Sequence, residues 1–153
     1  MIERLTRTAA PACTILIRLS VGLVFLSEGI QKFLLPDTIG AGRFAKIGIP
    51  SPQILGPLVG GTEIVCGAMV LCGLLVRLST IPLVIIMLTA IGTTKLPMLG
   101  DKGFWFMAHE SRTDFAMLLG SLFLLCAGAG RWSADAMLSR RGMQGTVDAK
   151  SRA

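Results

Sequence analysis

Five ionisable side chains lie within or at the ends of apolar segments of this 153-residue chain: Glu28, Lys32, Glu63, Lys95 and Asp114. Charge is costly in hydrocarbon, so such side chains usually pair, face a cavity and serve a function. Carboxylates beside ammonium groups can hold a polar ligand or pass a proton. We therefore expect a polar pocket; a cluster of ion pairs that only fixes the helix register is the alternative.

The segments that carry these residues are long enough to cross a bilayer. A spanning helix needs about 20 mostly apolar residues, and the chain offers four such segments, at approximately residues 14–35, 54–75, 78–98 and 114–130. Hydrophobic residues make up 52% of the chain and charged residues 16%, which is too apolar for a soluble domain of this size. Because backbone groups in lipid must be satisfied internally, we expect an all-α fold, an integral membrane four-helix bundle.

The basic residues flank the spans and predict an orientation. We expect one domain over residues 1–138 and a basic, disordered cytoplasmic tail over residues 139–153. Arginine and lysine are more numerous before the first span, in the second connection and after the fourth span than in the first and third connections. The basic residues on this richer side are Arg4, Arg7, Arg77, Arg131, Arg140, Arg141, Lys150 and Arg152. This bias predicts a multi-pass protein of the bacterial inner membrane with both termini cytoplasmic. The basic residues form no patch interleaved with aromatic residues, so no nucleic-acid partner is expected.

Helical spacing places one carboxylate among glycines. Residues at three- and four-residue spacing share one helix face, and this spacing recurs on the first two spans: Arg18, Gly22, Phe25, Gly29 and Lys32 on the first, and Gly56, Gly60, Glu63 and Gly67 on the second. Small residues at this spacing let helices pack closely in lipid. We expect the glycines to serve helix packing and Glu63 to lie buried in the contact face.

The predicted orientation puts all five ionisable residues in the outer half of the membrane. At 1.5 Å per residue, Glu28 and Glu63 lie about one turn below Lys32 and Lys95. We therefore predict Glu63 within salt-bridge reach of Lys32 or Lys95, because a buried carboxylate without a partner would be driven neutral. Snorkelling of both lysines to the interface is the alternative.

The connections are expected to complete the pocket. Residues 36–52 predict a short amphipathic helix that roofs the pocket from the outer surface. The third connection contains Phe104, Trp105 and Phe106, which is typical of an interfacial aromatic belt, with contact to a ligand as the alternative. His109 lies near the outer mouth and is either a proton relay or a solvated loop histidine. Ser133 is expected to cap a short helix that begins at Ala134.

The chain offers little for a metal. Its four cysteines form no Cys-x-x-Cys pair and His109 is its single histidine. Bis-histidine haem ligation within the chain is therefore excluded, and zinc or iron–sulfur sites are disfavoured. We predict no metal and no intrinsic cofactor.

The order of these motifs resembles the DoxX family over roughly residues 14–138. Four elements match in order. The first two are the spacing of Arg18, Gly22, Gly29 and Lys32 and the run Phe44-Ala45-Lys46-Ile47-Gly48-Ile49-Pro50. The last two are Glu63-x-x-x-Gly67, followed by Leu71, Gly73 and Arg77, and the run from Gly128 to Asp135. Asp114 departs from the glutamate expected near the start of the fourth helix.

The resemblance implies an accessory subunit of a membrane redox system, with a link to quinone or electrophile stress. Its outer-half pocket would bind a quinone-like molecule or relay protons, and a redox partner protein or the bound quinone would carry electrons. A homo-oligomer is a further expectation. Whether the chain has enzymatic activity of its own stays open. A permease or resistance protein for a small metabolite and a non-catalytic membrane scaffold are the alternatives.

Overall fold

The computed structural model describes residues 10–139, and this part of the chain is built from helices without strands. The helices are α2 (Thr14–Leu34), α3 (Ala41–Lys46), α4 (Pro52–Cys72), α5 (Val76–Ala90), the π-helical turn η1 (Ile91–Lys95), α6 (Leu96–Lys102) and α7 (Phe104–Ala127). Residues 134–139 are also helical. The predicted all-α membrane fold is confirmed, and the predicted tail lies almost wholly outside the described residues.

Three helical segments have the length and composition to cross a membrane. They are α2, α4 and the continuous segment Val76–Lys102, in which α5, η1 and α6 follow one another without a break. The fourth long helix, α7, has 24 residues and carries charged side chains in its amino-terminal half. Its apolar part is therefore shorter than its helix.

The third connection differs from the sequence-based expectation. Instead of a loop before residue 114, a single residue, Gly103, separates α6 from α7. Its φ of +81° favours glycine, so the chain can reverse there abruptly. Phe104, Trp105, Phe106 and His109 consequently belong to the first turns of α7. The loop prediction was wrong because hydropathy detects the apolar half of a helix and misses its polar half.

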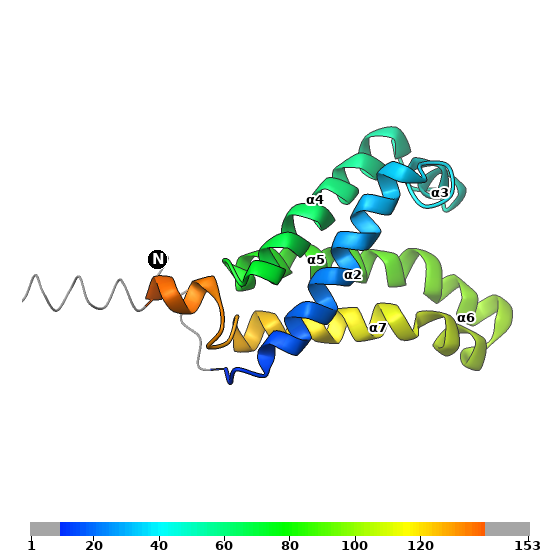
Figure 1. Ribbon diagram of the computed structural model, residues 1–153. Coiled ribbons are helices and arrows are strands. Elements are labelled where there is room, and N and C mark those ends of the chain that lie inside the picture. The colour runs from blue at the N-terminus through cyan, green and yellow to red at the C-terminus, as the bar shows by residue number, and fades with distance from the viewer. Residues whose placement is uncertain (1–9, 140–153) are drawn as a thin grey trace, which may run out of the picture.

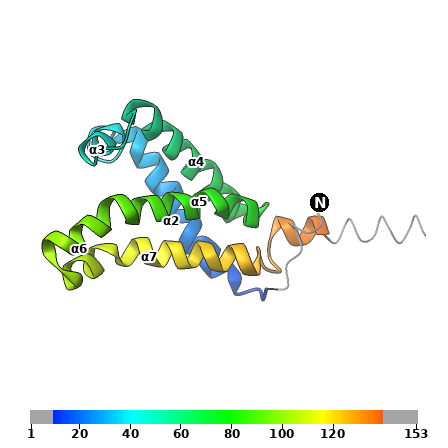
Figure 2. The same cartoon turned by 180° about the vertical axis from the view of Figure 1, so that it is seen from behind.

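The long helices form two pairs that meet at one end and diverge toward the other. Figures 1 and 2 show α2 with α4 as one pair and α5 with α7 as the other, and the two views agree on the divergence. The helix α3 lies at the far end of the first pair, and α6 lies at the far end of the second. We call the meeting end the junction end and the other the open end.

Glycines set the close contact of α2 with α4. A Cβ atom built on Gly29 would lie 2.7 Å from the carbonyl oxygen of Gly60, and one built on Gly67 would lie 2.9 Å from the backbone nitrogen of Leu26. Real Cβ atoms do not approach backbone this closely, so the two helices pack backbone to backbone, as small residues permit in membranes. Gly22 faces the same contact, and Gly56 packs against Ala41 of α3.

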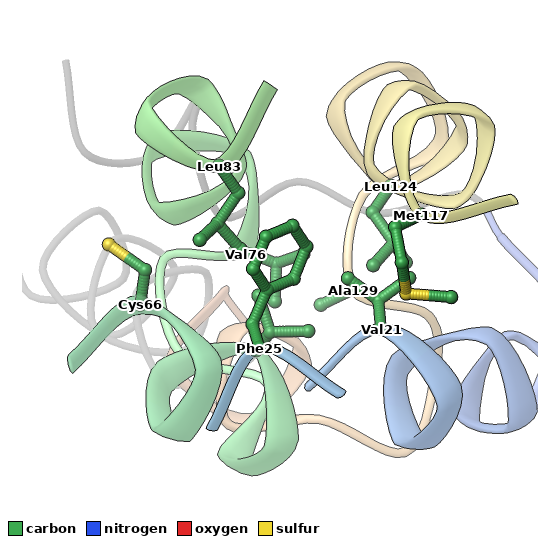
Figure 3. Close-up of a cluster of buried hydrophobic side chains, with 9 residues drawn as sticks. Val21, Phe25, Cys66, Val76, Leu83, Met117, Leu124 and Ala129 are labelled. Atoms are coloured by element: carbon green, nitrogen blue, oxygen red, sulfur yellow. The ribbon is translucent and has the colours of Figure 1, made fainter. Parts of the chain in front are cut away.

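Buried apolar side chains join the two pairs near the junction end. Figure 3 shows Val21 and Phe25 of α2 beside Leu83 of α5 and Met117 and Leu124 of α7. Phe25, Leu83 and Leu124 are each at most 1% exposed. Dense packing of this kind fixes how the pairs meet.

Arg18 and Asp135 add a polar junction at the same end. Arg18 is 2% exposed. Its guanidinium donates hydrogen bonds to carbonyl oxygens of the α4 carboxyl end and of the segment after α7: Val70 (2.9 Å), Leu71, Ala129 (3.3 Å) and Trp132 (2.6 Å). The Asp135 carboxylate accepts hydrogen bonds from the backbone N–H groups of Leu75 (2.7 Å) and Val76 (3.1 Å), at the start of α5. The arrangement satisfies terminal groups that a helix cannot satisfy itself.

The predicted cap at Ser133 is confirmed. The backbone N–H of Ala136 donates to the Ser133 Oγ atom at 3.1 Å, and the helix starts at residue 134. This short helix carries Asp135, so the cap also holds the carboxylate against α5.

Candidate functional site

A cavity of about 530 Å³ lies between the two helix pairs. The first pair contributes residues of α2 and α4 to one wall, and α5, η1 and α7 contribute the other. On α2, α5 and α7 the lining nearer the junction end is apolar and includes Val24, Phe25, Ile86 and Met117. Charged groups follow on these helices toward the open end, so the cavity combines an apolar floor with a charged belt.

The α2/α4 wall contains a buried ion pair. Lys32 Nζ lies 2.6 Å from Glu63 Oε2, and the two side chains are 9% and 2% exposed. Glu28 Oε2 lies 4.0 Å from the same ammonium but is 48% exposed, so it contributes less. The predicted burial of Glu63 is confirmed, and of its two predicted partners, Lys32 and Lys95, the structure shows Lys32.

The Glu63 carboxylate is incompletely satisfied. Its Oε2 atom is buried and contacts Lys32 Nζ, and no other donor among the described residues reaches it. A buried carboxylate oxygen in this state has capacity for a further donor.

The opposite wall contains a second ion pair on η1 and α7. Lys95 Nζ lies 3.2 Å from Asp114 Oδ2 and donates a hydrogen bond to the Glu110 carbonyl oxygen at 3.0 Å. Lys95 is 8% exposed and is the last residue of the π-helical turn. Such turns are rare and occur frequently at functional sites.

Local sequence explains part of that turn. Thr93 and Thr94 donate side-chain hydrogen bonds to the carbonyl oxygens of Thr89 (2.8 Å) and Ala90 (2.6 Å) one turn earlier. Threonines that bond back to their own helix loosen and bend it. The segment therefore departs from regular α-helix just where Lys95 enters the cavity.

The structure brings together five of the six predicted pocket residues. Glu28, Lys32, Glu63, Lys95 and Asp114 all line the cavity. His109 does not line it: this residue is exposed on α7, and its carbonyl oxygen accepts a hydrogen bond from Arg112.

Two charged residues that line the cavity were absent from the predicted set. Arg43 of α3 lines the cavity beside Phe44, so the predicted amphipathic helix exists and does border the pocket. Glu110 also lines the cavity. It precedes Asp114 by one helical turn and so shares its face. That spacing could have identified Glu110 had the helix been predicted to begin at Phe104.

The arrangement can bind a polar group and exchange protons with it. Each wall holds an ion pair whose ammonium can donate a hydrogen bond and whose carboxylate can accept one. Within residues 10–139, no group of three or more histidine, cysteine, aspartate or glutamate side chains gathers as metal ligands would.

Comparisons with known proteins agree with this architecture. A family model described as DoxX matches residues 13–96. The chain is 55% identical over 144 residues to "Uncharacterized membrane protein Rv3486" of Mycobacterium tuberculosis, covering 90% of this chain and 88% of that protein. It is 28% identical over 139 residues to "Putative oxidoreductase CatD" of Bacillus subtilis, covering 89% and 94%. No solved structure gives a significant match.

Proposed function

This chain belongs to the DoxX family, and we propose that it is an accessory subunit of a membrane redox system whose cavity binds a quinone-like small molecule. The proposal places the protein in the bacterial inner membrane with both termini cytoplasmic and the open end of the helix pairs toward the outer face. The observation that carries it is the pair of opposed ion pairs above an apolar floor.

The size and lining of the cavity suit such a ligand. Ligand sites usually enclose about 300 to 1,000 Å³ and are mostly apolar with a few convergent polar groups. A volume of about 530 Å³ lies within this range. Phe25 and Met117 can pack against an apolar ring, while the ion pairs meet its polar substituents. A redox setting is further supported by the oxidoreductase name of the Bacillus subtilis relative.

The residues of the chain would bind the ligand and handle protons. Lys32 and Lys95 donate hydrogen bonds to oxygen atoms of the ligand, and Glu63 and Asp114 hold or receive protons beside them. When bound, a quinone supplies reversible electron transfer coupled to proton uptake, and a partner redox protein exchanges the electrons. Because the charged belt lies toward the open end, protons would enter and leave there.

Mass spectrometry of the gently solubilised protein tests this function. We expect wild-type protein to copurify with membrane quinone in a near-stoichiometric amount, and Glu63→Gln to carry much less. Lys46→Met is the matched control, because Lys46 is an exposed lysine of α3 that does not line the cavity. Wild-type protein that carries no more quinone than an unrelated protein from the same membranes would contradict the proposal.

A further inference from the structure

Each wall of the cavity has hydrogen-bonding capacity left after its own ion pair is formed. An ammonium has three N–H donors. Lys95 directs one to the Glu110 carbonyl oxygen and one to Asp114, which leaves one. Lys32 directs one to Glu63, and its 4.0 Å distance to Glu28 is too long for a hydrogen bond. Lys32 thus retains at least one free N–H among the described contacts.

The carboxylates leave matching acceptors. Glu63 Oε2 is buried and lies 2.6 Å from Lys32 Nζ, and a carboxylate oxygen with one partner can accept a second hydrogen bond. Asp114 is 23% exposed and touches Lys95 through one of its two oxygens. Both walls can therefore donate a hydrogen bond to a ligand oxygen and also accept one from it. Such a wall accommodates a carbonyl or a hydroxyl group equally well.

The charge balance indicates a neutral occupant. Each of the two ion pairs joins one positive and one negative group, so neither pair carries a net charge. Glu28, Arg43 and Glu110 also line the cavity, but all three are exposed, so solvent screens their charges. A net charge on the ligand would have to compete with an existing buried pair, and breaking such a pair is costly. Neutral oxygen functions avoid that competition.

We propose that one neutral ligand bridges the two walls through two oxygen functions on opposite sides of an apolar ring. One oxygen lies against Lys32 and Glu63, and the other lies against Lys95 and Asp114. Because each wall offers both donor and acceptor, the dione and the diol forms of the ring both bind. This inference rests on the proposed function and adds to it that neither wall is sufficient alone.

The bridge is tested with a ligand that lacks one of the two oxygen atoms and with variants in which one of the two ion pairs is neutralised. The probes are a decyl para-hydroquinone and the decylphenol that lacks one of its two hydroxyl groups, both kept reduced. One wall is neutralised as a pair in Lys32→Met with Glu63→Gln, and the other in Lys95→Met with Asp114→Asn, so that no buried charge is left without a partner. Lys46→Met is the control.

Binding constants of purified protein in detergent distinguish the outcomes. For wild type and Lys46→Met we expect the hydroquinone to bind about tenfold more tightly than the phenol, as one hydrogen bond to a charged group allows. In each wall variant this ratio should fall to about one. Monodisperse elution and a retained unfolding transition establish that the variants are folded.

Three results would overturn the proposal, and they have different meanings. A wild type that binds both probes equally contradicts the bridge but leaves the proposed function in place. A ratio that persists in one wall variant shows that a single wall recognises the ligand. A wild type that binds neither probe, nor the oxidised decyl quinone, removes the proposed function together with the bridge.

Discussion

Replacing Glu63 by glutamine separates the structural contribution of the buried ion pair from its chemistry. The substitution nearly keeps the side-chain volume but removes the charge that lies 2.6 Å from Lys32 Nζ. The ammonium is then left with Glu28, which is 4.0 Å away and 48% exposed. Breaking a buried pair costs about 3 to 5 kcal/mol. Because the Lys32 side chain is 9% exposed and Glu28 compensates in part, we expect a loss near the lower end, about 3 kcal/mol.

The assay is thermal unfolding in detergent together with membrane abundance. A loss of about 3 kcal/mol lowers the unfolding midpoint by roughly 6 to 12 °C for a protein of this size. Adding Lys32→Met removes the uncompensated cation and should restore most of the midpoint and the abundance. Quinone content should stay low in both variants, because the α2/α4 wall is still lost.

Glu28→Gln is the matched control. Because the Glu28 carboxylate lies farther from Lys32 Nζ than Glu63 does and is more exposed, we expect Glu28→Gln to change the free energy of unfolding by less than about 1 kcal/mol. The reasoning is refuted if Glu63→Gln unfolds at the wild-type temperature, or if the double variant is no more stable than the single one. Wild-type stability with wild-type quinone content would remove Glu63 from both roles.

Three further substitutions probe the scaffold by the same unfolding measurement. Gly29→Ala forces a Cβ atom against the Gly60 carbonyl oxygen and should lower the free energy of unfolding by about 1 to 3 kcal/mol. Gly61→Ala is the control, because nothing lies within 4 Å of its new Cβ atom, and it should change stability little. Equal effects of the two substitutions would contradict the close contact. Arg18→Lys keeps the charge but loses the planar guanidinium that reaches several carbonyl oxygens, so the free energy of unfolding should fall by at least about 2 kcal/mol. An unchanged unfolding midpoint would show that the guanidinium is dispensable. Asp135→Ala leaves two backbone N–H groups at the start of α5 without an acceptor, so the free energy of unfolding should fall by about 1 to 2 kcal/mol. An unchanged unfolding midpoint would mean that water replaces the carboxylate.

Much of the α2/α4 contact could be predicted from the sequence because it depends on local periodicity. Gly22, Gly29, Gly60 and Glu63 share helix faces at fixed spacing, and each is buried. Burial of a carboxylate then requires a nearby cation, and helix depth leaves few candidates. These two constraints left Lys32 and Lys95 as candidate partners, and the structure pairs Glu63 with Lys32.

The second wall was less accessible to sequence reasoning. Its geometry depends on the π-helical turn that places Lys95 and on the reversal at Gly103, which brings Glu110 and Asp114 back along η1. Neither feature has a hydropathy signature. The sequence identified Lys95 and Asp114 by their cost in lipid, but it could not exclude His109, because the helix face of that residue depends on where α7 begins.

The two helix pairs diverge because tertiary contacts join them at the junction end. The residues that stabilise the fold therefore lie at the junction end, and the residues of the proposed binding site lie toward the open end. Arg18 and Asp135 satisfy helix ends there, and Phe25, Leu83 and Leu124 fill the adjacent core. Among the described residues, no equivalent core joins the pairs at the open end, where a cavity with charged walls lies. Burying charge at the open end costs stability that the packing at the junction end offsets. The packing at the junction end therefore lets the molecule keep two ion pairs on the walls of one cavity, and our ligand proposal rests on this arrangement.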